Sequence, residues 1–184
     1  LFDEIGVQKQ IDEAFLRQVW LPCGGYIVID ETEALISIDV NTGRNRGSKN
    51  VDKMILETNI EAAHETARQL RLRNVGGLVV VDFIDMRHRR DQQAVYRAMK
   101  ERLRRDRAKT QVLQISAVGL MEMTRQRLNE SLRDALLEPC PYCAGSGKVK
   151  TTMTMSVEIQ RELNTVLATR RDEIGDVIVV VSPD

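Results

Sequence analysis

The chain has 184 residues, of which 42% are hydrophobic and 29% charged, and its 27 basic and 27 acidic side chains cancel to a net charge of zero. This composition predicts a soluble globular protein with one ordinary core and at most a small second unit. It excludes any argument for a polyanionic partner from overall charge alone. We expect neither a membrane span nor a signal peptide, because no apolar run approaches about 18 residues.

The first part of the chain predicts a helix, a hairpin and a long amphipathic helix. The hairpin follows from two apolar runs around a polar turn. The long helix follows from apolar residues that keep a 3.6-residue period after Asn50, which can cap it. The predicted ranges are helix 4–20, strands 26–30 and 34–40, and helix 50–73.

The second part continues the alternation of strands and helices, which predicts an α/β fold. Its elements are strand 78–83, helix 92–105, strand 111–115, a part-loop, part-helical segment 120–137, a helix with Met155, Ile159, Leu163 and Val166 inward, and strand 177–181. The composition changes sharply over residues 139–147, which predicts a boundary there. Since the sequence begins at leucine and stops after a strand-like run, we expect a piece of a longer protein.

Two apolar runs end on an aspartate, Asp39 and Asp82, with a helix-length segment between them. A strand, a crossover helix and a second strand usually form parallel neighbours, whose carboxyl ends lie about 4.8 Å apart. Carboxylates this close repel, and a divalent cation such as Mg²⁺ relieves the repulsion. Asn41 shares a face with Asp39, and Asp85 is a third nearby carboxylate. The alternative is that both aspartates only cap strands or helix starts.

The sequence Cys140-Pro141-Tyr142-Cys143 supplies half of the four ligands that a structural zinc site needs. Cys23 is distant in sequence, so the other ligands would come from elsewhere. A redox pair and two inert thiols are the alternatives, although a redox pair normally opens a helix after a strand. Paired cysteines without a disulfide pattern favour a reducing compartment, which predicts a cytoplasmic protein.

Two arginine clusters are candidates for contact with a phosphate backbone, because the guanidinium fork matches phosphate and a basic path suits a single strand of nucleic acid. Arg71 and Arg73 lie at the end of one predicted helix, and Arg125 and Arg127 form the second cluster. The alternative is a solvated charged face, which we favour for residues 87–109 because basic and acidic groups alternate there. With 4% aromatic residues, no stacking platform stands out.

Many segments of this chain resemble the ribonuclease E/G family. They are residues 21–25, 32–35, 38–41, 58–63, 67–73, 76–77, 82–86, 119–120, 123–127 and 140–143. The resemblance runs through nearly all of residues 1–150 and implies an α/β fold with a DNase I-like mixed sheet. The implied domains are the tail of an RNase H-like subdomain at 1–14, the DNase I-like catalytic subdomain at 15–136, a zinc link at 137–150 and the start of a small dimerisation domain at 151–184.

The resemblance also implies a chemistry, namely Mg²⁺-dependent cleavage of single-stranded RNA in RNA processing and decay. Asp39 and Asp82 match the family's two aspartates that hold the catalytic Mg²⁺, and Asn41 matches the asparagine that orients the site. A metal-activated water would attack the phosphate and leave 5′-phosphate and 3′-hydroxyl ends.

In this family two protomers share one Zn²⁺, so Cys140 and Cys143 would join a homodimer, and a tetramer of two dimers stays open. The family's S1 domain and 5′-sensing subdomain have no counterpart in these 184 residues. Substrate grip and 5′-end preference are therefore left open for this chain, and the sequence does not define the cleavage-site preference or the natural RNA. The alternative function is a non-catalytic, zinc-joined dimer that binds RNA or scaffolds partners.

Overall fold

The computed structural model describes residue 4 and residues 6–44, 51–143, 145–169 and 178. It divides into two compact units, Leu1–Leu137 and Glu138–Asp184, which are described separately. The predicted change in composition begins just after this division. The subdomain assignments implied by the family resemblance stay predictions.

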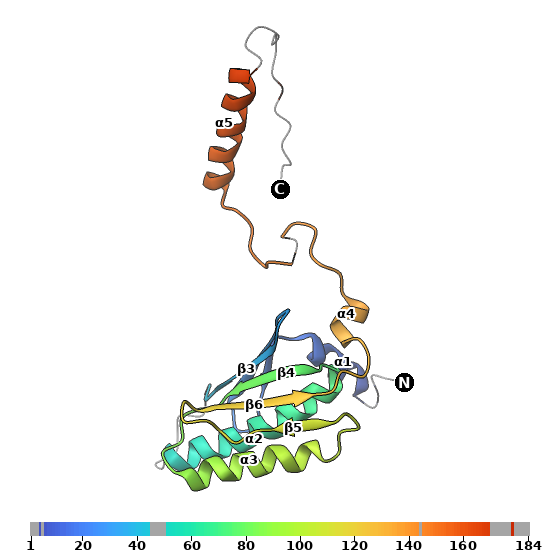
Figure 1. Ribbon diagram of the computed structural model, residues 1–184, viewed down its shortest axis with the longest axis vertical. Coiled ribbons are helices and arrows are strands. Elements are labelled where there is room, and N and C mark those ends of the chain that lie inside the picture. Colours follow the sequence, from blue (N-terminus) through green and yellow to red (C-terminus); the bar gives the residue numbers. More distant parts are fainter. Residues whose placement is uncertain (1–3, 5, 45–50, 144, 170–177, 179–184) are drawn as a thin grey trace. The chain divides into compact units, whose positions relative to one another are not determined.

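The first unit is built on a six-stranded sheet with the strand order β1-β2-β3-β4-β6-β5 (Figure 1). Its strands are β1 Gln18–Trp20, β2 Tyr26–Glu31, β3 Ile36–Asn41, β4 Gly77–Asp82, β5 Thr110–Val112 and β6 Leu120–Arg125. β3 and β4 run parallel, whereas every other neighbouring pair is antiparallel. The predicted α/β fold with a mixed sheet is therefore confirmed, and so is the hairpin of β2 and β3.

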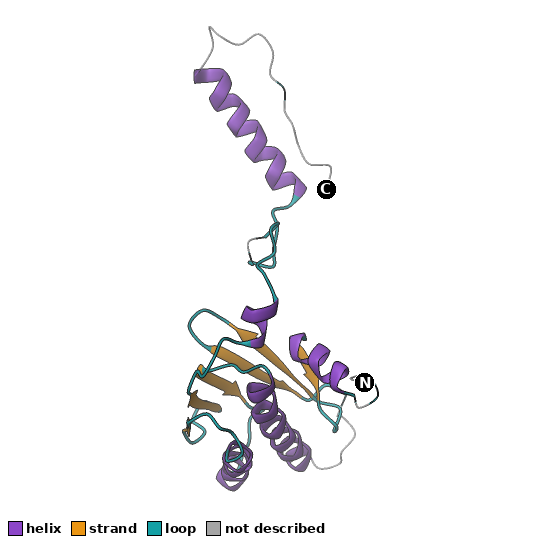
Figure 2. Ribbon diagram, turned by 90° about the vertical axis from the view of Figure 1, so that its right-hand side faces the viewer, coloured by secondary structure: helices purple, strands orange, loops and turns teal. Residues whose placement is uncertain are grey.

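Two long helices cover one side of this sheet (Figures 1 and 2). They are α2 Val51–Leu72, which is the crossover from β3 to β4, and α3 Arg89–Leu103; two shorter helices are α1 Val7–Phe15 and α4 Leu132–Leu136. Small residues of α2 and larger apolar residues of α3 point into the core. The buried ones are Ala62, Ala63, Ala67, Leu70, Val95, Met99 and Leu103.

Each inner strand buries alternate residues against these helices, as a half-buried strand must. The buried residues are Ile27 and Ile29 on β2, Ile36, Ile38 and Val40 on β3, Val79 and Val81 on β4, and Met121 and Met123 on β6. The residues between them project to the opposite face. The sheet therefore has one apolar, helix-covered face and one open face.

A hydrogen-bonded clamp fixes the chain where it leaves β4. The side-chain amide of Asn59, buried on α2, donates to the carbonyl of Ile84 at 2.8 Å, and its oxygen accepts from the Ile84 backbone N–H at 3.1 Å. Since buried backbone groups need partners, this amide replaces the missing strand neighbour. The clamp holds the loop that follows Asp82 against α2.

Three sequence predictions in the first unit are corrected by the structure. The helix predicted over residues 4–20 ends at Phe15, and Gln18–Trp20 form β1, which pairs with β2 and buries Val19. The segment predicted as loop and helix from residue 120 begins with strand β6. Leucine, methionine and glutamate favour helices in isolation, but pairing with two strands and burial of alternate methionines outweigh that preference. The strand predicted at 111–115 ends at Val112.

The second unit contains helix α5, Thr152–Thr169, which confirms the predicted helix. The apolar face predicted for this helix is not buried within the second unit, where Met155 is 48% exposed and Val166 is 43% exposed. The predicted strand at 177–181 lies outside the described residues apart from Ile178, and so does Asn50. Among the described helices, none is both long and apolar enough for a membrane span.

Candidate functional site

The site is built on the two strands that run parallel. Asp39 of β3 and Asp82 of β4 are direct partners in the parallel ladder, which sets their Cα atoms about 4.8 Å apart. Both side chains are exposed on the open face, since their neighbours Ile38, Val40 and Val81 are buried on the other. The predicted meeting of two carboxylates at one edge of the sheet is confirmed.

Asn41, the last residue of β3, positions one of these carboxylates. Its side-chain amide donates a hydrogen bond to Oδ2 of Asp39 at 2.7 Å. Because residues two apart on a strand share a face, the contact follows directly from the sequence Asp39-Val40-Asn41. The amide holds the Asp39 carboxylate in a fixed orientation at the sheet edge.

The electrostatics of this edge favour a cation. Burial raises the pKa of Asp82, and the negative charges of Asp39 and Asp85 raise it further. Asp85 is near enough to Gly119 that a Cβ on this glycine, whose φ is +87°, would come within 3.2 Å of Asp85 Oδ1. A bound cation would offset the repulsion within this acidic group.

The donor set fits Mg²⁺, which usually binds through one or two carboxylates and retains several waters. In the described part of the chain, no three histidine, cysteine or acidic side chains converge on one point, so the protein would supply the two carboxylates and water the remaining ligands. The two carboxylates are hard oxygen ligands, as this cation requires, and Asn41 orients one of them.

Two of the four predicted RNA-contact arginines are inside the protein. Arg73 is fully buried and donates to Gln69 Oε1 at 2.9 Å and to the carbonyl of Leu16 at 2.7 Å. Arg125 is 4% exposed and forms a two-pronged ion pair with Asp106 at 2.8 and 3.1 Å. These guanidinium groups hold the fold together, so we do not retain them as RNA contacts.

The other two arginines face the outside to different degrees. Arg71 is half-buried and donates to the carbonyl of Arg102 at 3.2 Å, which ties α2 to α3. Arg127, just beyond the end of β6, is exposed. Of the predicted cluster residues, Arg127 has the most accessible guanidinium.

The cysteine pair lies in the second unit, in a turn that favours thiolates. Cys140 is exposed and Cys143 partly exposed. The backbone N–H of Gly147 donates to Cys143 Sγ at 3.3 Å, and this bond is the main reason that the pKa of the Cys143 thiol is lowered. Gly145 and Gly147 both have positive φ, which the turn requires. Two such thiols fit half of a tetrahedral zinc site.

Cys23, the third cysteine, has a different environment. It lies in the first unit, where its Sγ is 3.8 Å from Thr58 Oγ1 and burial raises the pKa of its thiol. Its backbone N–H donates to Glu61 at 2.8 Å. A protonated, packed thiol is a structural group rather than a ligand.

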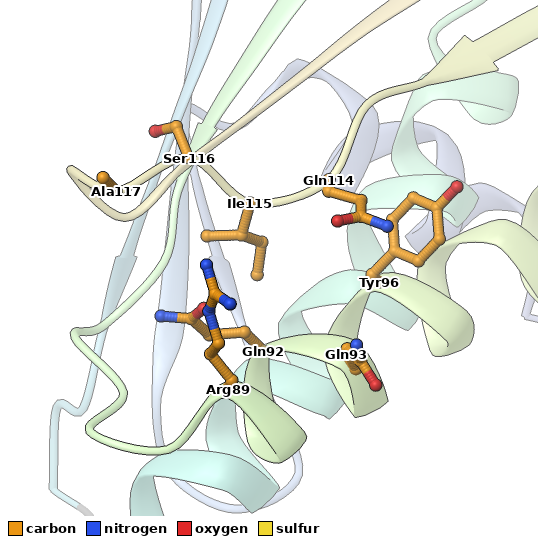
Figure 3. Close-up of a pocket in the computed structure, with 8 residues that line it drawn as sticks. All are labelled: Arg89, Gln92, Gln93, Tyr96, Gln114, Ile115, Ser116 and Ala117. Carbon is orange, nitrogen blue, oxygen red and sulfur yellow. The ribbon is translucent and has the colours of Figure 1, made fainter.

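A cavity of about 350 Å³ lies between α3 and the loop after β5 (Figure 3). It is lined by Arg89, Gln92, Gln93, Tyr96, Gln114, Ile115, Ser116 and Ala117. A neighbouring cavity of about 230 Å³ shares Gln92, Ile115 and Ala117 with it and extends to Asp85. Neither lining includes Asp39 or Asp82, so these two aspartates lie on the open surface, and only Asp85 borders a cavity.

Sequence reasoning missed an aromatic pair on the open face, Trp20 and Tyr26, whose ring centroids are 5.3 Å apart. Trp20 was hidden by the incorrect helix, and its proximity to Tyr26 depends on strand register. Gln18–Trp20 gave no usable signal, because three residues are too few to show a period.

The fold and the site define a class of α/β proteins that bind their ligands at the carboxyl ends of the sheet's parallel strands, where Asp39 and Asp82 lie here. A sequence model of the Ribonuclease E/G family matches residues 1–128 of this chain. The chain therefore belongs to the ribonuclease E/G family, as its motifs indicated.

Individual relatives support the same assignment. The chain is 47% identical over 163 residues to Ribonuclease G of Escherichia coli K12, which covers 89% of this chain and 33% of that protein. It is 48% identical over 161 residues to Ribonuclease E of the same strain, covering 88% of this chain and 15% of the relative. Ribonuclease E of Haemophilus influenzae is 48% identical over 163 residues, covering 89% and 17%. The chain thus spans a third or less of these relatives.

Proposed function

We propose that this chain carries the catalytic centre of a magnesium-dependent endoribonuclease that cleaves single-stranded RNA during RNA processing and decay in the cytoplasm. The observation that supports it best is the pairing of Asp39 with Asp82 across the parallel strands, with Asn41 bonded to Asp39. The family membership adds to this, because the relatives described above are named as ribonucleases.

In this proposal Asp39 and Asp82 hold the Mg²⁺, and Asn41 keeps the Asp39 carboxylate turned toward it. When bound, the cation lowers the pKa of a water and stabilises charge on the phosphoryl oxygens. The two strands fix the carboxylates before substrate arrives, so little reorganisation accompanies the reaction. The products carry 5′-phosphate and 3′-hydroxyl ends.

The shape of the site suits a polymer. Asp39 and Asp82 lie on an open sheet face, where an internal segment of a single strand can approach without an end being threaded. Arg127 lies beside Gly76, at the opposite end of β4 from Asp82, and Arg71 lies at the end of α2, so both are kept as candidates for phosphate contacts away from the two aspartates. Charge neutralisation of this kind is sequence-independent.

The metal requirement is the direct test. A labelled single-stranded RNA with a 5′-monophosphate is expected to be cut in Mg²⁺ and to remain intact in EDTA, and the new ends should be 5′-phosphates by mass spectrometry. Equal cleavage in EDTA would contradict the proposal. Tight RNA binding in both conditions without any cleavage would favour the non-catalytic scaffold instead.

We also propose that Cys140 and Cys143 of two protomers share one Zn²⁺. The hydrogen bond from Gly147 favours the thiolate that zinc requires. The double variant Cys140→Ser/Cys143→Ser is expected to have half the mass of the unmodified protein in light scattering and to lose one zinc per dimer. Cys23→Ser is the matched control and should keep both. A serine double variant that stays dimeric would show that the thiolates are not the joint.

A further inference from the structure

Strand register places an aromatic pair beside the candidate metal site. Trp20 of β1 is the direct partner of Tyr26 of β2, and Tyr26 is the direct partner of Asn41 of β3. Opposite residues of an antiparallel ladder project to the same face, with Cα atoms about 4.5–5.5 Å apart. Trp20 and Tyr26 therefore lie on the open face with Asp39, in a straight row that ends at Asn41.

The aromatic pair is accessible, and the positively charged side chain of Arg44 lies beside it. Trp20 is 55% exposed, and its ring meets that of Tyr26 edge to face, with an interplanar angle of 62°. The guanidinium carbon of Arg44 lies 5.7 Å from the centre of the Trp20 ring. The Arg44 backbone N–H donates to the carbonyl of Gly24 at 3.0 Å, which anchors this residue beside β1 and β2.

Gly43 allows this arrangement. Its φ is +54°, and a Cβ there would lie 2.5 Å from the Gly24 carbonyl oxygen and 3.2 Å from the Tyr26 ring. The turn after Asn41 thus passes close enough to place Arg44 over the aromatic pair. Strand register and this turn together bring two groups that recognise nucleic acid, a π-surface and a guanidinium, to the edge that carries Asp39.

We propose that Trp20, Tyr26 and Arg44 form a nucleobase subsite, in which a base of single-stranded RNA close to the scissile phosphate stacks on the aromatic pair and Arg44 contacts the adjoining phosphate. This inference rests on the proposed function and specifies how its substrate is held. Stacking tolerates any base, because every base has a π-face. Arg44 supplies the positive charge that the acidic edge lacks.

Trp20 is the one tryptophan of the 184 residues, so its fluorescence reports on this subsite alone. The 184-residue protein is titrated with a non-cleavable 2′-O-methyl oligonucleotide, while anisotropy of a labelled copy measures binding independently. We expect the fluorescence to be quenched with the same midpoint as the anisotropy. Trp20→Phe should bind within about twofold of the unmodified protein, whereas Trp20→Ala should bind about tenfold more weakly. Leu136→Ala, at an exposed apolar residue of α4, is the control and should change nothing.

Cleavage assays add a second readout. Trp20→Ala should raise KM with little change in kcat, and an abasic nucleotide next to the cleavage site should weaken the unmodified enzyme but not this variant. Oligonucleotide binding without quenching would overturn the subsite. A change of fluorescence with protein concentration alone would also overturn it, since a second copy of the chain would then cover Trp20 and Tyr26. Quenching without Mg²⁺-dependent cleavage would contradict the nuclease but support the subsite. The absence of any binding would contradict both.

Discussion

Replacing Asp39 by asparagine is expected to slow RNA cleavage about a thousandfold at saturating Mg²⁺, since a metal site supplies several kcal/mol of transition-state stabilisation. The side chain is exposed and asparagine has nearly the same volume, so the fold should be retained. The substitution also removes one of the negative charges that raise the pKa of Asp82. Thermal stability in EDTA should therefore be unchanged or slightly higher.

Single-turnover rates and Mg²⁺ titration calorimetry would measure this effect. Asp12→Asn, at an exposed aspartate of α1, is the matched control and should retain both the rate and the Mg²⁺ affinity. Asn41→Ala should slow cleavage less than Asp39→Asn, because it removes only the amide that orients Asp39. An Asp39→Asn enzyme that cleaves within threefold of the unmodified rate would show that the chemistry lies elsewhere.

Replacing Arg125 by methionine is expected to cost about 3–5 kcal/mol of unfolding free energy, because it leaves the carboxylate of Asp106 buried without its partner. Both side chains of this ion pair are only 3% exposed. The guanidinium also donates to the carbonyl of Val75 at 2.6 Å, and this acceptor would be left unsatisfied as well. Urea denaturation measures the loss.

Arg127→Met is the control for this prediction, since it removes an exposed arginine two positions along and should change stability by no more than about 0.5 kcal/mol. The double variant Asp106→Asn/Arg125→Met should lose less than the sum of its single variants, because neither partner is then stranded. Equal losses for Arg125→Met and Arg127→Met would contradict a structural role for Arg125.

The same ion pair sets an acid limit on stability. Burial alone would raise the pKa of Asp106, but the bond from Arg125 and the N–H of Ala108 outweigh it, so the pKa lies below its ordinary value of 3.8. A carboxyl with a lowered folded pKa stabilises the protein at pH above its unfolded pKa, and that contribution is lost as pH falls through the folded one. Between neutrality and strongly acid pH, the stability difference between the unmodified protein and Asp106→Asn should shrink.

The site geometry was more predictable than parts of the fold. Asp39 and Asp82 could be placed together because two strands joined by a crossover helix usually form parallel neighbours. Asn41 followed from the alternation of side chains along β3. The short strand β1 was not predictable, because three residues are too few to show a period. Strand β6 was hidden by helix-favouring residues whose burial depends on two neighbouring strands.

The arginines illustrate a second limit. Nothing local distinguishes Arg125 from Arg127, since the partner that buries the former, Asp106, lies 19 positions away. The aromatic row has the same origin, because the position of Trp20 opposite Tyr26 is fixed by register and not by composition. Contacts within one element, and the pairing of two strands joined by one crossover helix, can be predicted from sequence, whereas the register of β1 on β2 and the partner of Arg125 need the structure.

The parallel pairing of β3 and β4 would also link the proposed metal binding to folding. Asp39 and Asp82 approach each other only when helix α2 has closed the connection between the two strands, so an unfolded chain offers the cation two separate, weak carboxylates. A ligand that binds the folded state alone deepens the native free-energy minimum by an amount that grows with its concentration. The ion that the proposed reaction needs would thus also act as a folding ligand, and cellular magnesium would help determine how long the sheet edge stays assembled.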